Sequence, residues 1–391
     1  MSSLNYLEKL LGGVEVEWRT LREVTIPTSN VKWRDVDRTY RYIDLTSVSI
    51  ETKKIIETSE VTANNAPSRA QKLIEKNDVI FATTRPAQQR YCLIDGEYSG
   101  EVASTGYCVL RAKKNDVLPK WILYCIASTD FKSYVEENQS GSAYPAISDA
   151  KVKEFQIPIP PLDVQSEIVR ILDNFTELTA ELTAALTARK KQYNYYRDKL
   201  LSFEDGAVEW KTLGELAENL DSMRRPVTSG LRESGEIPYY GASGIVDYVK
   251  DYLFDGDFLL VSEDGANLLA RNTPIAFSVS GKSWVNNHAH ILKFQTYVER
   301  RYIEYYLNSI DLTPYISGAA QPKLNQKFLN SIFIPNPSPE EKERIVSILD
   351  KFDALTNSIR EGLPREIELR QKQYEYYRDL LLSFPKSDVA A

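Results

Sequence analysis

Apolar residues recur at intervals of three and four along two long stretches of the chain. In the first stretch they are Ile168, Ile171, Phe175, Leu178 and Leu182 and, after a four-residue shift, Leu186, Tyr193, Tyr196, Leu200 and Phe203. In the second they are Ile345, Ile348, Phe352, Leu355, Ile359, Leu363, Ile367, Tyr374, Tyr377, Leu381 and Phe384. This spacing predicts two long helices that pair along a coiled-coil seam with a stutter. We expect the seam, or a surface where partner chains dock, at Ile168, Ile171, Phe175, Leu182, Tyr196, Leu200, Ile345, Ile348, Phe352, Tyr377 and Leu381.

Each predicted helix follows a proline-rich segment, at residues 157–161 and 334–337. The fixed φ of proline favours an extended lead-in and the start of a helix. Gly362 and Pro364 interrupt the second helix. Because proline removes a helical hydrogen bond, we expect a kink or short break there.

The segments before the two helices have the mixed pattern of an α/β domain. In the first, the β-rich run 78–83 is followed by turn signals at Asp95-Gly96 and Ser140-Gly141, and residues 120–131 have the pattern of a short helix. In the second, strands are expected near 258–261 and 291–294, followed by a helix at 300–308.

The chain is an internal duplication. VEWRTLREV at 16–24 returns as VEWKTLGEL at 208–216, and residues 155–175 return in altered form at 332–352. QYNYYRDKLLSF at 192–203 returns as QYEYYRDLLLSF at 373–384 with ten of the twelve positions identical. Weaker matches join 140–148 to 317–325 and 6–11 to 196–201. We therefore expect two equivalent halves related by an approximate two-fold axis.

Charge weighs against a simple electrostatic DNA binder, because nonspecific affinity comes mainly from basic side chains that release counterions. The formal net charge is −7. Residues 15–156 carry 20 basic and 20 acidic side chains, and residues 205–333 carry 12 and 16. If the chain binds DNA, partner subunits must supply much of the positive surface.

The candidate catalytic and metal-binding residues do not have the spacing that the known motifs require. Ser280-Gly-Lys-Ser283 resembles the end of a phosphate-binding loop, but Ala276 stands where the first glycine belongs. His288 and His290 have no cysteine nearby and are expected to be ordinary strand or loop residues, so we expect no metal. The three cysteines, Cys92, Cys108 and Cys125, are odd in number and widely spaced, which argues against a disulfide framework and a CxxC metal site. We expect them to be core residues.

The first residues lack a secretory signal, and no stretch is apolar enough to span a membrane. We therefore expect a cytoplasmic protein.

Two variable domains, each followed by a proline-rich entry and a long helix, resemble the specificity subunits of type I restriction-modification systems over the whole chain. The repeated YYRD blocks and the TAELTAAL sequence at 179–186 look like the type IC branch, whose central helix carries copies of a TAEL tetrapeptide. Here Ala185 replaces the second glutamate.

The resemblance implies an α+β fold in which two duplicated mixed α/β target recognition domains are separated by two long helices forming an antiparallel coiled coil, pseudo-two-fold symmetric. We expect the first target recognition domain at 1–156, a central helix at 157–204, the second target recognition domain at 205–333 and a C-terminal helix at 334–391.

The resemblance also implies a non-catalytic adaptor that recognises a bipartite sequence in double-stranded DNA and scaffolds two modification (methyltransferase) subunits and two restriction subunits. The chain itself would bind no cofactor, and S-adenosylmethionine would belong to the methyltransferase partners. The rival hypothesis is a duplicated protein–protein scaffold without DNA binding, which the acidic balance slightly favours. A stand-alone methylase or nuclease is disfavoured because the motifs for those reactions are missing.

Candidate DNA contacts cluster in predicted loops outside the strongly repeated blocks, where side chains offer donors suited to base edges and phosphates. In the first domain they are Lys32, Trp33, Arg34, Thr84, Arg85, Gln88, Arg90 and Tyr144. In the second they are Arg224, Arg225, Tyr240, Ser243, Lys282, Asn286, Gln321 and Lys323.

Overall fold

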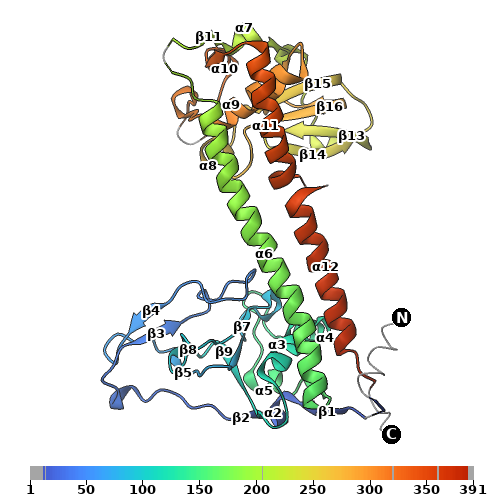
Figure 1. Cartoon of the computed structure of the whole chain (residues 1–391). Helices are drawn as coiled ribbons and strands as arrows, with labels where there is room; N and C mark the ends of the chain where they lie inside the picture. Colours follow the sequence, from blue (N-terminus) through green and yellow to red (C-terminus); the bar gives the residue numbers. More distant parts are fainter. Residues whose placement is uncertain (1–11, 14, 205, 319–320, 359–360, 386–391) are drawn as a thin grey trace. The chain divides into compact units, whose positions relative to one another are not determined.

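The computed structural model describes residues 12–13, 15–204, 206–318, 321–358 and 361–385. The chain divides into a first unit, made of residues 1–181 and 367–391, and a second unit, made of residues 182–366. Each unit contains one β-rich lobe and two long helical segments (Figure 1). The sequence repeat is therefore also a structural repeat. The predicted match at 6–11 lies outside the described residues.

The first lobe precedes the first long helix. Its strands are β1 (Glu17–Thr20), β2 (Thr25–Ile26), β3 (Tyr40–Ile43), β4 (Ser59–Val61), β5 (Ala70–Leu73), β6 (Val79–Ala82), β7 (Tyr91–Leu93), β8 (Val102–Ser104), β9 (Tyr107–Ala112) and β10 (Gln156–Ile159). Its helices are α2 (Leu21–Val24), η1 (Trp33–Asp35), η2 (Pro86–Gln88), α3 (Pro119–Ala127), α4 (Thr129–Asn138) and α5 (Asp149–Val152).

Two four-stranded sheets, in the orders β2-β9-β6-β7 and β4-β3-β8-β5, form this lobe. All four residues of the central strand β6 are buried. Val79 and Phe81 belong to one hydrophobic cluster and Ile80 and Ala82 to another, so both faces of the strand are covered. A strand covered on both faces has a continuous apolar run, which is why 78–83 was recognisable in the sequence.

The second lobe follows the first long helix. Its strands are β11 (Glu209–Thr212), β12 (Glu218–Asn219), β13 (Ser234–Gly241), β14 (Gly244–Val249), β15 (Phe254–Ser262), β16 (Ala276–Val285), β17 (Ala289–Lys293) and β18 (Phe333–Asn336). Its helices are α7 (Leu213–Leu216), η3 (Asp221–Met223), η4 (Ser229–Leu231), α8 (Asn267–Ala270), α9 (Tyr297–Ser309), η5 (Thr313–Tyr315) and α10 (Gln326–Asn330).

One six-stranded sheet, in the order β12-β17-β15-β16-β13-β14, takes the place of the two sheets of the first lobe. The parallel pair β13–β16 repeats the parallel pair β3–β8. In β15 and β16, Gly256 faces Gly281 on the same rung, and both have positive φ. Glycine adopts this backbone without a steric cost, which suits a bend in the hairpin.

Each lobe is closed by a two-stranded antiparallel clasp. We call β1–β10 the first clasp and β11–β18 the second, with Trp18 opposite Pro158 and Trp210 opposite Pro335. The repeated VEW blocks thus pair with the repeated proline-rich entries. In both copies a threonine–glutamate capping box, Thr20 with Glu23 in the first, starts the short helix that follows.

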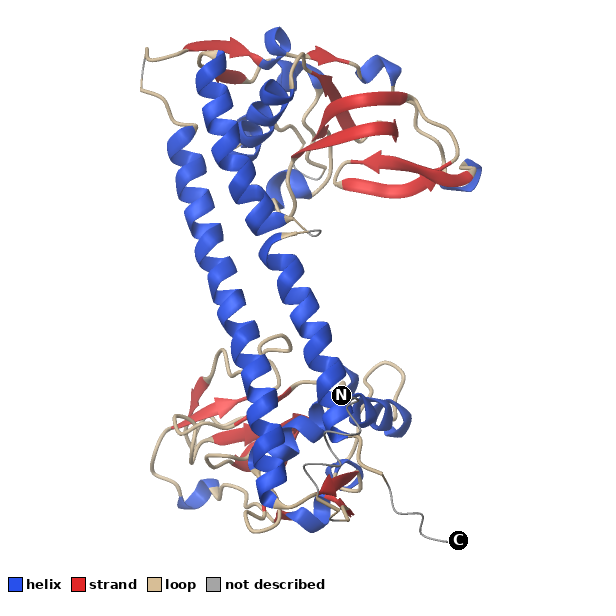
Figure 2. Cartoon of the chain, turned by 45° about the vertical axis from the view of Figure 1, so that its right-hand side comes forward, coloured by secondary structure: helices blue, strands red, loops and turns tan. Residues whose placement is uncertain are grey.

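The long helices are α6 (Leu162–Leu200), α11 (Pro339–Asn357) and α12 (Gly362–Leu382). In the first unit, α6 and α12 run side by side in opposite directions (Figures 1 and 2). The predicted antiparallel pairing is confirmed. The predicted break is also confirmed, because α11 ends before Gly362, whose φ is 82°. A Cβ there would lie 2.4 Å from the carbonyl oxygen of Ala354, so glycine is required.

Repeated aspartates on the long helices hold each lobe's own helix. Asp173 on α6 accepts hydrogen bonds from Tyr124 Oη at 2.6 Å and from Lys120 Nζ at 2.7 Å. The equivalent Asp350 on α11 accepts from Tyr305 Oη at 2.6 Å and from Arg301 Nε at 3.0 Å. The sequence pairing of these two aspartates therefore corresponds to one structural role.

The predicted helix at 120–131 is wrong in its length and continuity. The structure has two helices, α3 and α4, separated at Ser128. The backbone of Ser128 is extended, and its hydroxyl accepts a hydrogen bond from the Phe131 amide, which caps α4. Serine favours such a cap over a position inside a helix.

All three cysteines are buried and free, as expected of core residues. Burial raises the pKa of the Cys92 and Cys108 thiols to about 12. Within the described residues, no helix is long and apolar enough to cross a membrane.

Candidate nucleic-acid interface

Three segments of the first lobe meet at the end of β6. The Thr83 amide donates to the Gly106 carbonyl at 2.8 Å, and the Ile147 amide donates to the Thr83 carbonyl at 2.9 Å. The Arg85 amide donates to the Pro145 carbonyl at 2.7 Å. Isolated bridges join Thr84 to Ala146 and Ser140 to Ala146. We call this junction the first loop frame, made of residues 83–85, 106 and 140–147.

The second lobe repeats the same connections at the end of β15. The Glu263 amide donates to the His288 carbonyl at 2.9 Å, the Leu324 amide to the Glu263 carbonyl at 2.8 Å, and the Gly265 amide to the Pro322 carbonyl at 3.1 Å. Bridges join Asp264 and Ser317 to Lys323. The second loop frame consists of residues 263–265, 288, 317–318 and 321–324.

The two loop frames share a backbone and differ in their side chains. Thr84 stands where the second frame has Asp264, Arg85 where it has Gly265, and Ala146 where it has Lys323, as the equivalent bonds and bridges establish. A constant backbone that presents different side chains is the arrangement expected of a surface that distinguishes ligands.

Arg85, Gln88 and Tyr144 are exposed in the first frame and in the loop that continues it. The Tyr144 ring is 73% exposed, and the Arg85 guanidinium lies 5.5 Å from its centroid. Arg85 and Gln89, which bracket η2, are both left-handed, with φ of 49° and 51°. Left-handed backbone is uncommon outside glycine and is found often in ligand-binding loops.

Lys32, Trp33 and Arg34 lie elsewhere, at η1 beside the other sheet of the lobe. The Trp33 indole donates to the Ala70 carbonyl at 2.8 Å and contacts Tyr40 edge to face. Lys32 and Arg34 are exposed. Among the described residues, no hydrogen bond or ion pair joins this group to the first loop frame.

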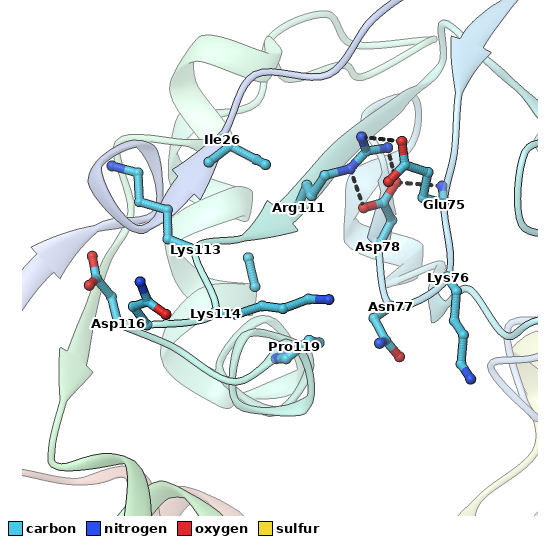
Figure 3. A pocket seen from close by; sticks show the side chains of 12 residues that line it. Ile26, Glu75, Lys76, Asn77, Asp78, Arg111, Lys113, Lys114, Asp116 and Pro119 are labelled. Carbon is cyan, nitrogen blue, oxygen red and sulfur yellow. Dashed lines mark hydrogen bonds and ion pairs between the residues drawn. The ribbon is translucent and has the colours of Figure 1, made fainter.

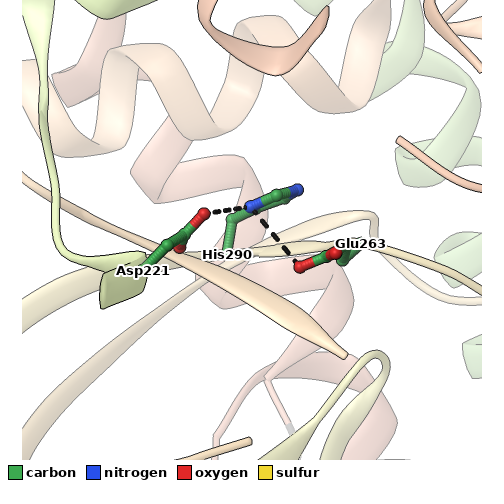
Figure 4. Close-up of side chains that lie close together, drawn as sticks. All are labelled: Asp221, Glu263 and His290. Carbon is green, nitrogen blue, oxygen red and sulfur yellow. Dashed lines mark hydrogen bonds and ion pairs between the residues drawn. The ribbon is translucent and has the colours of Figure 1, made fainter. Parts of the chain in front are cut away.

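Arg224 in the second lobe takes part in a buried charge network. Its guanidinium contacts Glu263 at 2.6 Å and Asp221 at 3.4 Å, and Lys323 contacts the same glutamate at 3.1 Å. His290 lies between the two acids, with Nδ1 2.5 Å from Asp221 and 3.8 Å from Glu263 (Figure 4). The network lies directly behind the second loop frame, because Glu263 belongs to both.

Burial acts to raise the pKa of Asp221 and Glu263, but their partners outweigh it. The hydrogen bond and charge of His290, the Ile291 amide and Arg224 hold the pKa of Asp221 below its usual value. Arg224, His290 and Lys323 lower the pKa of Glu263. Both carboxylates are therefore ionised at neutral pH.

Asp221, Glu263 and His290 also meet the spacing of a metal site, with ligand atoms within 4.8 Å of one another. The neighbours do not suit one. His290 Nε2 lies 2.7 Å from the Leu324 carbonyl oxygen, to which it must donate, and Nδ1 faces a carboxylate. Arg224 and Lys323 already supply the positive charge that a cation would bring. The residues fit a compensated ion network better than a metal centre.

The other candidates of the second lobe are placed around this network. Asn286 is buried, and its backbone amide donates to the Tyr240 carbonyl at 3.1 Å. Ser243, Gln321 and Arg225 are exposed. Lys282 lies next to Gly281 in the bend of β16, 4.6 Å from the Tyr252 ring. The run 280–283 is thus strand, not the strand-to-helix loop that a phosphate-binding motif requires.

A hollow of about 550 Å³ lies at the opposite end of the β6–β9 ladder from the first loop frame (Figure 3). Lys76, Lys113 and Lys114 line it. Arg111 is held inside by ion pairs to Asp78 at 2.8 Å and Glu75 at 2.7 Å. The sequence did not single out this group, because Lys76 comes from one turn and Lys113 and Lys114 come from another.

The predicted seam residues lie on the helices, buried to different degrees. In the first unit Ile168 and Leu381 are in the core, Ile171 packs against it, and Phe175 stacks on Tyr377. In the second unit Ile345 is in the core, Leu200 packs against it, and Phe352 stacks on Tyr196. Leu182 is half-buried. Ile348, Tyr196, Leu200 and Phe352 border a hollow of about 710 Å³.

Four tyrosines at the helix ends stay exposed. Tyr195 and Tyr196 are 60% and 42% exposed, and their repeats Tyr376 and Tyr377 are 63% and 38% exposed. Each pair meets edge to face. Exposed aromatic pairs are typical of protein interfaces.

Comparisons with known proteins agree with this architecture. The profile of the type I restriction modification DNA specificity domain matches residues 24–189 and 207–369. The chain is 38% identical to the EcoR124I/EcoR124II specificity subunit of Escherichia coli, with 100% of each chain covered. It is 33% identical to the EcoprrI specificity subunit of Escherichia coli over 92% of this chain and 93% of that one. A chain of a solved type I system superposes with a TM-score of 0.64 at 22% identity, covering 94% and 98% of the two chains.

Proposed function

Because this chain belongs to the family of type I restriction modification DNA specificity subunits, we propose that its two loop frames each read one half of a bipartite DNA target. The observation that supports this proposal is that the two frames have equivalent backbone connections but present different side chains. The family match supports DNA recognition and does not support the alternative of a scaffold without DNA binding.

The chemistry of the frames predicts two different half-sites. The first frame offers the hydroxyl of Thr84, the guanidinium of Arg85 and the ring of Tyr144. The second offers the carboxylate of Asp264, the amide of Gln321 and the ammonium of Lys323. Arginine and lysine suit guanine edges, carboxylates suit the cytosine amine, and glutamine suits adenine. The two frames should therefore read different half-sites.

The exposed tyrosine pairs at 195–196 and 376–377 are the surfaces we assign to the two modification subunits. A surface present twice suits two copies of one partner. Two restriction subunits would complete the assembly. This chain would be non-catalytic, S-adenosylmethionine would be bound by the modification subunits, and the complex would act in the cytoplasm. Membership of the type IC branch is part of the same proposal.

Mapping of modified bases tests the proposal. The chain is expressed with its modification subunits in a host that lacks them, and methylated positions are read by single-molecule sequencing. We expect a motif of two different half-sites with a fixed gap, and no methylation when either protein is expressed alone. A continuous motif, or methylation by the modification subunits without this chain, would contradict it.

A further inference from the structure

Two loops of the first lobe hold each other through positively charged side chains. The Lys53 ammonium, in the hairpin 48–55, donates to the Gln89 carbonyl. The Arg90 guanidinium, in the loop 85–90, donates back to the Val48 carbonyl. Lys53 also lies over the Tyr91 ring, with Nζ 4.5 Å from the centroid. Both cations are therefore fixed by neutral partners.

These two charges are not compensated. Among the described residues, no carboxylate lies within ion-pair distance of Lys53 or Arg90. Burial first, and the charge of Arg90 second, lower the pKa of Lys53 to about 8. Arg224 and Lys323 in the second lobe, by contrast, share Glu263. Two neighbouring half-buried cations repel each other unless an anion joins them.

The backbone around the two cations is also unusual. Lys53, Arg85 and Gln89 have φ of 54°, 49° and 51°. In the part of the chain that the structure describes, the buried amide oxygen of Gln89 has no hydrogen-bond partner. Left-handed non-glycine residues and unsatisfied polar atoms both cost stability, and such costs concentrate where a ligand is bound.

We propose that Lys53 and Arg90 form a binding site for a backbone phosphate of DNA in the first lobe, an inference that rests on the proposed function. A phosphate oxygen accepts from an ammonium and a guanidinium together, and it neutralises the local charge. Arg85 and Gln88 lie in the same loop as Arg90, so the phosphate contact fixes the loop on the duplex while those side chains face bases.

Salt dependence of binding tests the site, because each phosphate contact releases counterions. The chain is assembled with its modification subunits, and affinity for a duplex that carries the mapped target is measured between about 50 and 200 mM salt. For K53M we expect the slope of log affinity against log salt to fall in magnitude by about 0.9. Affinity at the lowest salt should fall by about tenfold. The mapped half-sites should not change.

Lys54 supplies the matched control, since it is the adjacent lysine in the same hairpin and is exposed. K54M and the charge-preserving K53R should keep the wild-type slope. Thermal melting verifies that K53M is folded, and R90M provides an independent variant.

Three results separate the inference from the proposed function. If the wild-type complex shows no bipartite target, the proposed function fails. If the wild type binds its target and K53M and R90M keep the wild-type slope, only the phosphate site is refuted. If the two variants keep the slope but lose a modification subunit, the cations face a protein carboxylate, which also refutes it.

Discussion

Phe175 stacks on Tyr377 with ring centroids 5.6 Å apart and ring planes 22° apart. The repeat positions form the same contact within the second unit, where Phe352 stacks on Tyr196 at 5.7 Å and 25°. The order of the partners is reversed along the chain, because each pair joins one repeat's phenylalanine to the other repeat's tyrosine. The duplication has therefore preserved an intramolecular contact in two copies.

Tyr377→Ala should destabilise the chain by about 2 kcal/mol. Full burial of the predicted seam would imply about 3–5 kcal/mol for such a truncation. Tyr377 is 38% exposed, so only part of its transfer energy and the ring contact are lost. Tyr196→Ala should have a similar effect. Chemical denaturation measures both, and a loss below about 0.5 kcal/mol would contradict the stacking role.

Tyr376→Ala should separate assembly from stability. Tyr376 is 63% exposed and its loss should change stability by less than about 0.5 kcal/mol. If the tyrosine pairs bind the modification subunits, Tyr376→Ala combined with Tyr195→Ala should weaken co-purification at both copies. Full retention of both subunits would remove these surfaces from the proposal.

Asp221→Ala should destabilise the second unit by about 3–5 kcal/mol. The change leaves His290 and Arg224 buried with one carboxylate between them, and an uncompensated buried charge is costly. Asp247→Ala is the control, because Asp247 pairs with Arg232 near the surface and its loss should lower the melting temperature much less. Equal melting temperatures for the two variants would show that the network contributes little.

The stability of the protein at acidic pH should depend on the same network of Asp221, Glu263, His290 and Arg224. The folded-state pKa of Asp221 is lowered, so its contribution to stability is present above the unfolded value of about 3.9 and is lost as the pH falls through the folded value. The melting temperature of the wild type should therefore fall more steeply below about pH 4 than that of Asp221→Asn. Parallel curves for the two proteins would contradict this assignment.

Lys323→Met should change only one half-site. Lys323 belongs to the second loop frame, and loss of a good base contact reduces discrimination by about 1–3 kcal/mol at that position. Lys327→Met is the control, because Lys327 is exposed on α10 outside the frame. Mapping of modified bases reads both half-sites at once. A change in both, or in neither, would place Lys323 outside the recognition surface.

The helices and the duplication could be predicted from the sequence because their signals are local. Residues such as Ile168 and Ile345 follow the helical period, and Gly362 with Pro364 marks the break. The division at Ser128 was missed because the residues on both sides of it are compatible with one continuous helix. Only the packing of α3 and α4 decides in favour of the cap.

The loop frames depend on contacts between distant residues and could be predicted only in part. Arg85 and Lys323 were singled out as donors, but their equivalence to Gly265 and Ala146 follows from bonds between segments some 60 residues apart. Lys53 was missed because it is distinguished by having no carboxylate close to it in space among the described residues, and the sequence does not show which residues are neighbours in space. Arg224 has the residue type of a base reader, and only the structure shows that Asp221 and Glu263 hold it.

The two clasps have a consequence for how recognition can change. Because Trp18 lies opposite Pro158, and Trp210 opposite Pro335, each lobe begins and ends at one place on its own unit. A segment whose two ends are adjacent can gain or lose residues internally without moving the elements to which it is attached. The clasp thus defines a segment that can be exchanged as a unit, and grafting a foreign lobe between its two strands should replace one half-site of the proposed target while leaving the long helices as they were.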